Sequence, residues 1–189
     1  TQVALDIMKN GGNAIDAAIG ANAALGLMEP TGSGIGGDLY AILWHEKTQR
    51  LYGLNASGRS PKSLTYDKLQ EELAKLGREG LPPYGMLPIS VPGAVDGWFE
   101  LHSKFGQMPM DKILQPAIDY AENGFPVSEL IAYYWKLSVP RLSPQPGSFK
   151  ETFTIDGKAP REGQLFKNPE LANTYKLLAQ NGRYAFYQG

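Results

Sequence analysis

The segment 14–28 constrains the fold most strongly, because small side chains occupy most of its positions. These small residues are Ala14, Ala17, Ala18, Gly20, Ala21, Ala23, Ala24 and Gly26. Asn13 precedes them and can cap a helix by accepting a hydrogen bond from the backbone N–H of Asp16, whose negative charge also suits the positive end of the helix dipole. We therefore expect a helix that ends near Met28 and packs closely against a sheet or another helix.

A short helix is predicted before this segment. Its apolar face at helical spacing consists of Val3, Ala4, Ile7 and Met8. The Gly11-Gly12 pair that follows Asn10 can adopt the left-handed conformation that ends a helix. The chain therefore opens with a predicted pair of helices.

The glycine-rich stretch 31–37 leads into an apolar run at 39–44. Side chains of a strand point alternately to its two faces, and in this run both sets are apolar. This predicts a strand covered on both faces. The polar stretch 45–49 is typical of a turn, and 50–55 returns as a second strand. We expect a β-hairpin in the middle of a layered α/β fold.

The remainder, 66–189, is predicted to be a mainly helical section of the same domain, after the helix pair and hairpin of 1–65. The expected helices are 66–76, 94–105, 110–122, 128–138 and 169–180, with loops at 77–88 and from about 138 to 164. Pro116 falls inside one expected helix. Because proline has no N–H to donate to the preceding turn, we expect it to kink the helix or to mark a new first turn.

The composition is that of an ordinary globular protein, with 42% hydrophobic and 20% charged residues among 189. Eighteen Lys plus Arg against nineteen Asp plus Glu give a net charge of -1. Since the chain has no excess of positive charge that would attract phosphate groups, nucleic acid is not an expected partner. The absence of cysteine removes disulfides, thiolate nucleophiles and Cys-ligated metals, but it leaves the compartment open.

No transmembrane role is expected. The most apolar segment, 14–28, is shorter than the about 20 residues that span a bilayer, and it contains Asp16 and Asn22. The chain shows no signal-peptide pattern at Thr1, although a chain that starts without Met can already be trimmed. Cytoplasmic and periplasmic or secreted locations therefore both stay open.

The glycines Gly32, Gly34 and Gly37 have the spacing of a dinucleotide-binding fingerprint. That mechanism needs the order strand, glycines, helix, whereas here a helix precedes and a strand follows. We interpret these glycines as a strand entrance where backbones approach closely. Asp38 next to them could be a general base or a metal ligand, but an Asp at the start of a strand is more often a turn or cap residue.

Neither histidine has a partner at metal-ligand spacing, so we expect no metal site and no cofactor. His45 is predicted to be a solvated turn residue, and His102 a hydrogen-bonded core residue on an apolar helix face. Thr1 could act as nucleophile and base through its own α-amine. We reject that role because Thr1 opens an amphipathic helix, whereas such a nucleophile normally opens a strand in a cleft.

Several blocks of the sequence together resemble the γ-glutamyltranspeptidase family. The blocks are 5–18 (LDIMKNGGNAIDAA), 34–37 (GIGG), 91–97 (VPGAVDG), 115–118 (QPAI), 124–128 (GFPVS) and 186–189 (FYQG). They occur in the order and spacing of the family over nearly the whole chain. Their number makes a chance resemblance a poor explanation.

The resemblance implies a mixed α/β (α+β) chain that forms part of the αββα sandwich of an N-terminal nucleophile hydrolase. Such enzymes are zymogens that process themselves into a large and a small subunit, and the small subunit opens with the catalytic Thr. The family's Thr motif is absent from this sequence. The resemblance thus implies that the chain is large-subunit sequence without a catalytic residue, that the nucleophile lies downstream of Gly189, and that the partner is the small subunit of the same precursor.

The resemblance also implies a substrate: a γ-glutamyl amide such as glutathione. Family members commonly carry Arg-Glu-x-Ala-Pro after the second strand, and that Arg contacts the α-carboxylate of the substrate. Here 55–61 reads NASGRSP, which places Ser57 at the position of the Arg and Arg59 two residues later. Two extended residues span about 6.6 Å on one face. Arg59 and Ser57 are therefore the candidate substrate-binding residues, and an ordinary surface role for Arg59 stays open.

Two alternatives remain at this point. An acylase or amidase of the same fold would act on a substrate other than a γ-glutamyl amide, which the missing Arg-Glu pair favours. A noncatalytic binding homologue would retain the scaffold alone. An intact Thr motif downstream would indicate an enzyme, and its loss would indicate a binding protein.

Overall fold

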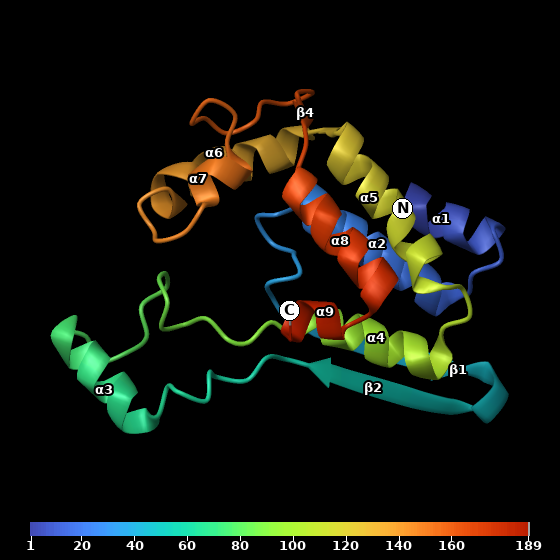
Figure 1. The fold of residues 1–189 in the computed structure, drawn as a ribbon, viewed down its shortest axis with the longest axis horizontal. Coiled ribbons are helices and arrows are strands. Elements are labelled where there is room, and N and C mark those ends of the chain that lie inside the picture. The colour runs from blue at the N-terminus through green and yellow to red at the C-terminus, as the bar shows by residue number, and fades with distance from the viewer. Residues whose placement is uncertain (189) are drawn as a thin grey trace.

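The chain is mainly helical with one long β-hairpin (Figure 1). The computed structural model describes residues 1–188. Its helices are α1 Gln2–Lys9, α2 Ala14–Met28, α3 Tyr66–Lys75, α4 Ala94–Phe105, α5 Met110–Asn123, α6 Glu129–Leu142, α7 Phe149–Phe153, α8 Pro169–Asn181 and α9 Tyr184–Tyr187. Its strands are β1 Leu39–His45, β2 Arg50–Ala56, β3 Phe125–Pro126 and β4 Leu165–Phe166, and a short 3-10 helix, η1 Glu46–Thr48, joins β1 to β2.

The start of α2 is capped as predicted. The side-chain oxygen of Asn13 accepts hydrogen bonds from the N–H groups of Ile15 (2.9 Å) and Asp16 (3.1 Å). In return, Oδ2 of Asp16 accepts from the N–H of Asn13 at 2.9 Å, which completes a capping box. Gly11 has φ 94, so the predicted left-handed stop after α1 is also confirmed.

The small residues of α2 allow the close packing that the sequence predicts. A Cβ at Gly20 would lie 3.0 Å from the carbonyl oxygen of Ile113 on α5. The hydroxyl of Tyr175 on α8 donates to the carbonyl of Ala23 at 2.9 Å, and the indole of Trp98 on α4 donates to Asn22 at 2.8 Å. Helix α2 is thus the centre of a core that α1, α4, α5 and α8 surround (Figure 1).

The hairpin is antiparallel, with a register that runs from Leu39 opposite Ala56 to His45 opposite Arg50. Helix α4 packs on one of its faces. The other face is exposed, with 80% exposure at Ile42, 67% at Leu51, 66% at Tyr40 and 54% at Trp44. The prediction of a strand covered on both faces is therefore wrong for residues 1–188, because these residues supply a cover on one side alone.

We expect the isolated chain to self-associate through this open face, because it combines exposed apolar side chains with unpaired strand edges. Size-exclusion chromatography at increasing concentration, with a hydrophobic dye, should show growing oligomers and dye binding. Ile42→Lys should reduce both, whereas Leu130→Lys, which removes a 60% exposed leucine from α6, should not. A tight monomer that binds no dye over a wide concentration range would contradict this expectation.

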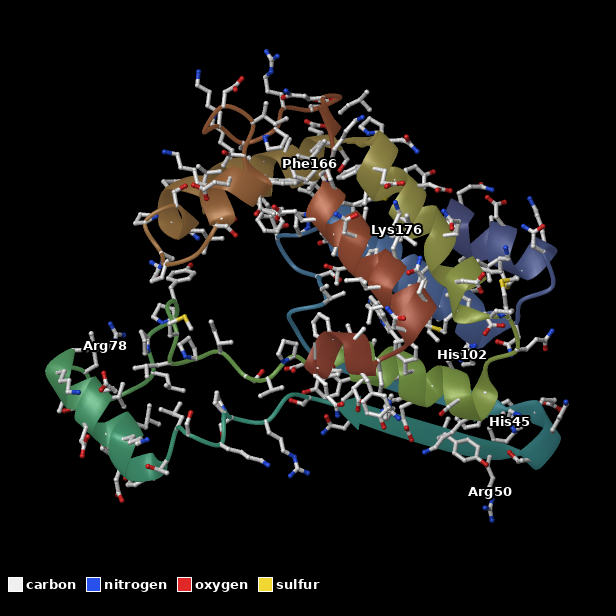
Figure 2. The ribbon with its side chains drawn as sticks, viewed as in Figure 1. His45, Arg50, Arg78, His102, Phe166 and Lys176 are labelled. Carbon is white, nitrogen blue, oxygen red and sulfur yellow. The ribbon has the colours of Figure 1, made fainter. Side chains whose placement is uncertain are left out.

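The helical section differs from the prediction in detail. Helix α5 continues through Pro116 as one element, and α6 extends through Pro140 to Leu142 rather than ending near Ser138. The two-residue strands β3 and β4 pair, with Phe125 opposite Phe166, where no strand was expected. Helix α7 lies in the predicted loop. Helix α3 lies at the end of an arm that extends from the hairpin, and Arg78 lies near the tip of that arm (Figure 2).

Candidate functional site

Asp38 ties the beginning of β1 to the end of β2. Its Oδ1 accepts a hydrogen bond from the N–H of Gly58 at 2.7 Å, and its Oδ2 accepts from the hydroxyl of Ser57 at 3.5 Å. The amide of Ser57 donates to the side chain of Asn55 at 2.9 Å. Asp38 thus has the structural role of a turn residue, and it also places a carboxylate beside Ser57.

The segment 91–94 crosses the same end of the hairpin. The amides of Gly93 and Ala94 both donate to the carbonyl of Gly37 at 3.0 Å. A Cβ at Gly93 would lie 2.1 Å from the carbonyl oxygen of Ala56, and a Cβ at Gly58 would lie 1.8 Å from that of Val91. These distances leave no room for a side chain, so both glycines are needed for the close approach of three backbone segments.

Two hollows flank this crossing. The first, the glycine hollow, measures about 410 Å³ and is lined by Asn22, Pro30, Thr31, Gly32, Ser33, Gly34, Gly36, Gly37 and Asp38. The second, the Arg59 groove, also measures about 410 Å³ and is lined by Gly58, Arg59, Ser60, Lys62, Val91, Pro92, Gly93, Asp96 and Tyr187. The glycines of the first hollow lie between α2 and β1, an order that does not suit a dinucleotide fingerprint.

The structure places the two predicted substrate residues differently. Ser57 contacts Asp38 beside the glycine hollow, whereas Arg59 lines the Arg59 groove. Within residues 1–188, the side chains of Arg59 and Lys62 form no salt bridge. Asp96, the acidic residue of the groove, is paired with Arg183. The groove therefore keeps a positive charge that can attract an anionic group.

A wall of the groove depends on Tyr187, which belongs to the sequence block 186–189. Its hydroxyl donates to the carbonyl of Pro92 at 2.8 Å and accepts from the N–H of Asp96 at 3.0 Å. Burial raises the pKa of Tyr187, and the hydrogen bond with Asp96 raises the pKa of Arg183. The match of 186–189 to the family was the sequence signal that could have pointed to this residue.

The two histidines have structural roles at the turn end of the hairpin and on α4 (Figure 2). Nε2 of His102 lies 2.7 Å from the carbonyl oxygen of Met108, which confirms the predicted hydrogen bond, but the residue is half-buried rather than part of the core. His45 is also half-buried: its ring lies 5.4 Å from that of Phe105, and its Nδ1 lies 2.9 Å from the hydroxyl of Thr48. His45 is thus a turn residue as predicted, but it is only partly solvated, because Phe105 at the end of α4 packs against its ring.

Residues 1–188 contain no group of three or more His, Asp or Glu side chains that could hold a metal ion. None of the helices in this range is both long and apolar enough to cross a membrane. Thr1 immediately precedes α1, as predicted, rather than a strand.

Solved structures define the class of fold. The chain matches a cephalosporin acylase from Bacillus halodurans at 42% identity and a TM-score of 0.91, over 100% of this chain and 35% of that chain. It matches the gamma-glutamyltranspeptidase of Helicobacter pylori at 30% identity and a TM-score of 0.89, over 100% of this chain and 53% of that one. The chain therefore has the mixed α/β fold of this part of the N-terminal nucleophile hydrolases.

The chain belongs to the gamma-glutamyltranspeptidase family, whose family model matches residues 1–189. A curated relative, the glutathione hydrolase-like YwrD proenzyme of Bacillus subtilis (strain 168), is 38% identical over 184 residues. That match covers 97% of this chain and 34% of the relative, so the chain spans about a third of the relative's length. The resemblance stated from the sequence blocks is thereby confirmed.

Proposed function

We propose that the complete protein hydrolyses or transfers the γ-glutamyl group of glutathione and related amides. In this proposal the chain is large-subunit sequence that builds the scaffold and part of the substrate site. The family match over residues 1–189 is the observation that carries the proposal. The glutathione hydrolase-like relative supports the same reaction class.

The chemistry of the proposal resides in the partner, the small subunit from the same precursor. A Thr that opens that subunit attacks the γ-glutamyl amide, and its free amine carries the proton to the leaving amine. Backbone N–H donors stabilise the oxyanion of the intermediate. The acyl-enzyme then passes its γ-glutamyl group to water or to an acceptor amine.

In this proposal Arg59 binds the α-carboxylate of the substrate. Arg59 lines a groove of about 410 Å³. It forms no salt bridge within residues 1–188, so an incoming carboxylate would not have to displace a partner there. An Arg and a carboxylate form short, charge-assisted and often bidentate hydrogen bonds, which suits recognition of this group.

Arg59→Ala in the complete protein should lower kcat/KM for a γ-glutamyl chromogenic amide by about 2–4 kcal/mol of transition-state binding, because the substrate carboxylate loses its partner. For an amide that lacks the α-carboxylate, the same variant should lose nothing. Arg78→Ala is the matched control, since Arg78 lies near the tip of the α3 arm (Figure 2). Unchanged kinetics in Arg59→Ala would remove Arg59 from the substrate site.

The second candidate function is that of an acylase with another amide substrate. Ser57 stands where the family's Arg is expected, and the carboxylate of Asp38 lies 3.5 Å from its hydroxyl, where it would repel a substrate carboxylate. The 42% identity to the Bacillus halodurans acylase favours the same alternative. If Ser57→Arg creates or raises γ-glutamyl activity while Arg59→Ala changes nothing, the acylase is the better assignment.

A further inference from the structure

We propose that Tyr187 is a positioning residue that holds the 91–93 wall of the Arg59 groove in its substrate-binding shape. The inference rests on the proposed function, because the groove is assigned there to the substrate. Tyr187 acts through the backbone of this wall rather than by touching the reacting atoms.

Tyr187 supplies the cap that the sequence of α4 lacks. The N-cap of α4 is Gly93, which has no side chain to accept from the first backbone N–H groups of the helix. The N–H of Asp96 instead donates to the hydroxyl of Tyr187, a residue 91 positions later in the chain. The same hydroxyl donates to the carbonyl of Pro92 on the other side of Gly93. The Tyr187 oxygen therefore forms a hydrogen bond on each side of Gly93, with Pro92 in the wall and with Asp96 in the first turn of α4.

The wall in turn fixes the backbone of Arg59. The N–H of Val91 donates to the carbonyl of Arg59 at 2.9 Å, and the N–H of Gly93 donates to the carbonyl of Gly37 at 3.0 Å. A displacement of Pro92 would move both contacts, because Val91 and Gly93 are its direct neighbours. Loss of the Tyr187 hydroxyl should therefore shift the backbone of Arg59 and that of Gly37, which lines the glycine hollow.

Arg183, which precedes α9, completes the arrangement. Its guanidinium forms a salt bridge with the carboxylate of Asp96 and lies 3.9 Å from that of Glu100. The pairing offsets the negative charge of Asp96 in the groove, so Arg59 remains available to a substrate. A tyrosine hydroxyl titrates at about pH 10, and burial raises the pKa of Tyr187 further, so the hydroxyl holds the proton that it donates to Pro92 at neutral pH.

Tyr187→Phe in the complete protein is the test, since Phe keeps the apolar wall and removes only the hydroxyl. We expect KM for a γ-glutamyl chromogenic amide to rise about tenfold with kcat nearly unchanged, because the variant loses both hydrogen bonds of the Tyr187 hydroxyl. The amide hydrogens of Val91 and Asp96 should exchange about tenfold faster. In an Arg59→Ala background, Tyr187→Phe should add little to KM, because both residues act on one contact.

Tyr184→Phe is the matched control. Tyr184 belongs to the same short helix, its side chain is 63% exposed, and it makes no side-chain hydrogen bond within residues 1–188, so the variant should behave as wild type. A lower melting temperature and kcat with unchanged KM in Tyr187→Phe would show a purely structural role and overturn the inference, as would unchanged exchange at Val91 and Asp96. If the wild-type protein turns over no γ-glutamyl amide, the proposed function fails. The exchange measurement then still decides whether Tyr187 holds the wall.

Discussion

Asp16→Ala is expected to destabilise the complete protein by about 2–4 kcal/mol, because it leaves several backbone donors without a partner. Asp16 is fully buried, with 0% exposure. Its carboxylate accepts from the N–H of Asn13 at 2.9 Å and from those of Gln107 and Met108 at 3.1 Å. One side chain thus caps α2 and fastens the connection between α4 and α5, so its removal loosens contacts between segments about 90 residues apart.

Urea unfolding of the complete protein would measure this effect. Asp16→Asn should lower the stability by an intermediate amount. Its amide oxygen can still accept a hydrogen bond, but its NH₂ group cannot accept from the backbone N–H groups that the second carboxylate oxygen binds. Asp6→Ala is the control on α1, where the carboxylate is 49% exposed, and it should change stability by less than about 0.5 kcal/mol. If Asp16→Ala and Asp6→Ala unfold at the same urea midpoint, the hydrogen bonds of Asp16 do not stabilise the fold as proposed.

Local signals predicted the first part of the fold well. Asn13, Asp16 and Gly11 specify the ends of α1 and α2 through contacts within a few residues, and the structure confirms each of them. The pattern of an apolar run, a polar turn and a returning segment identified both strands of the hairpin. It could not show which face is covered, because a side chain such as Ile42 is apolar whether its cover lies in this chain or elsewhere.

Contacts between distant segments explain what the sequence did not show. Phe125 and Phe166 pair as two-residue strands, too short for any alternation to be visible. The ring of Trp135 lies 4.7 Å from that of Phe166, so α6 packs against this small ladder. The predicted helix ended near 138, but α6 continues through Pro140 to Leu142.

The sequence named candidate residues for the site, which stay predictions, but it did not predict how they are arranged. Spacing placed Ser57 and Arg59 on one face of an extended segment, whereas in the structure Asp38 contacts Ser57 and Arg59 lines a separate groove. The closing block 186–189 pointed to the family, but nothing local indicated that the Tyr187 hydroxyl reaches Pro92, 95 positions earlier. Long-range partners of this kind are not encoded in a local pattern.

The other large effect concerns activity, which should be absent from the chain on its own. We expect residues 1–189 to show no turnover, because the nucleophilic Thr of the proposed mechanism belongs to the small subunit. Thr1 does not replace it, since it immediately precedes the helix α1. The complete, processed protein should in contrast release the product steadily.

The release of chromophore from a γ-glutamyl chromogenic amide, measured in parallel for the chain 1–189 and the complete protein, tests this account most directly. We expect turnover by the complete protein and a signal at the level of buffer for the chain. Turnover by the purified chain that disappears in a Thr1→Ala variant would contradict it and would make Thr1 the nucleophile.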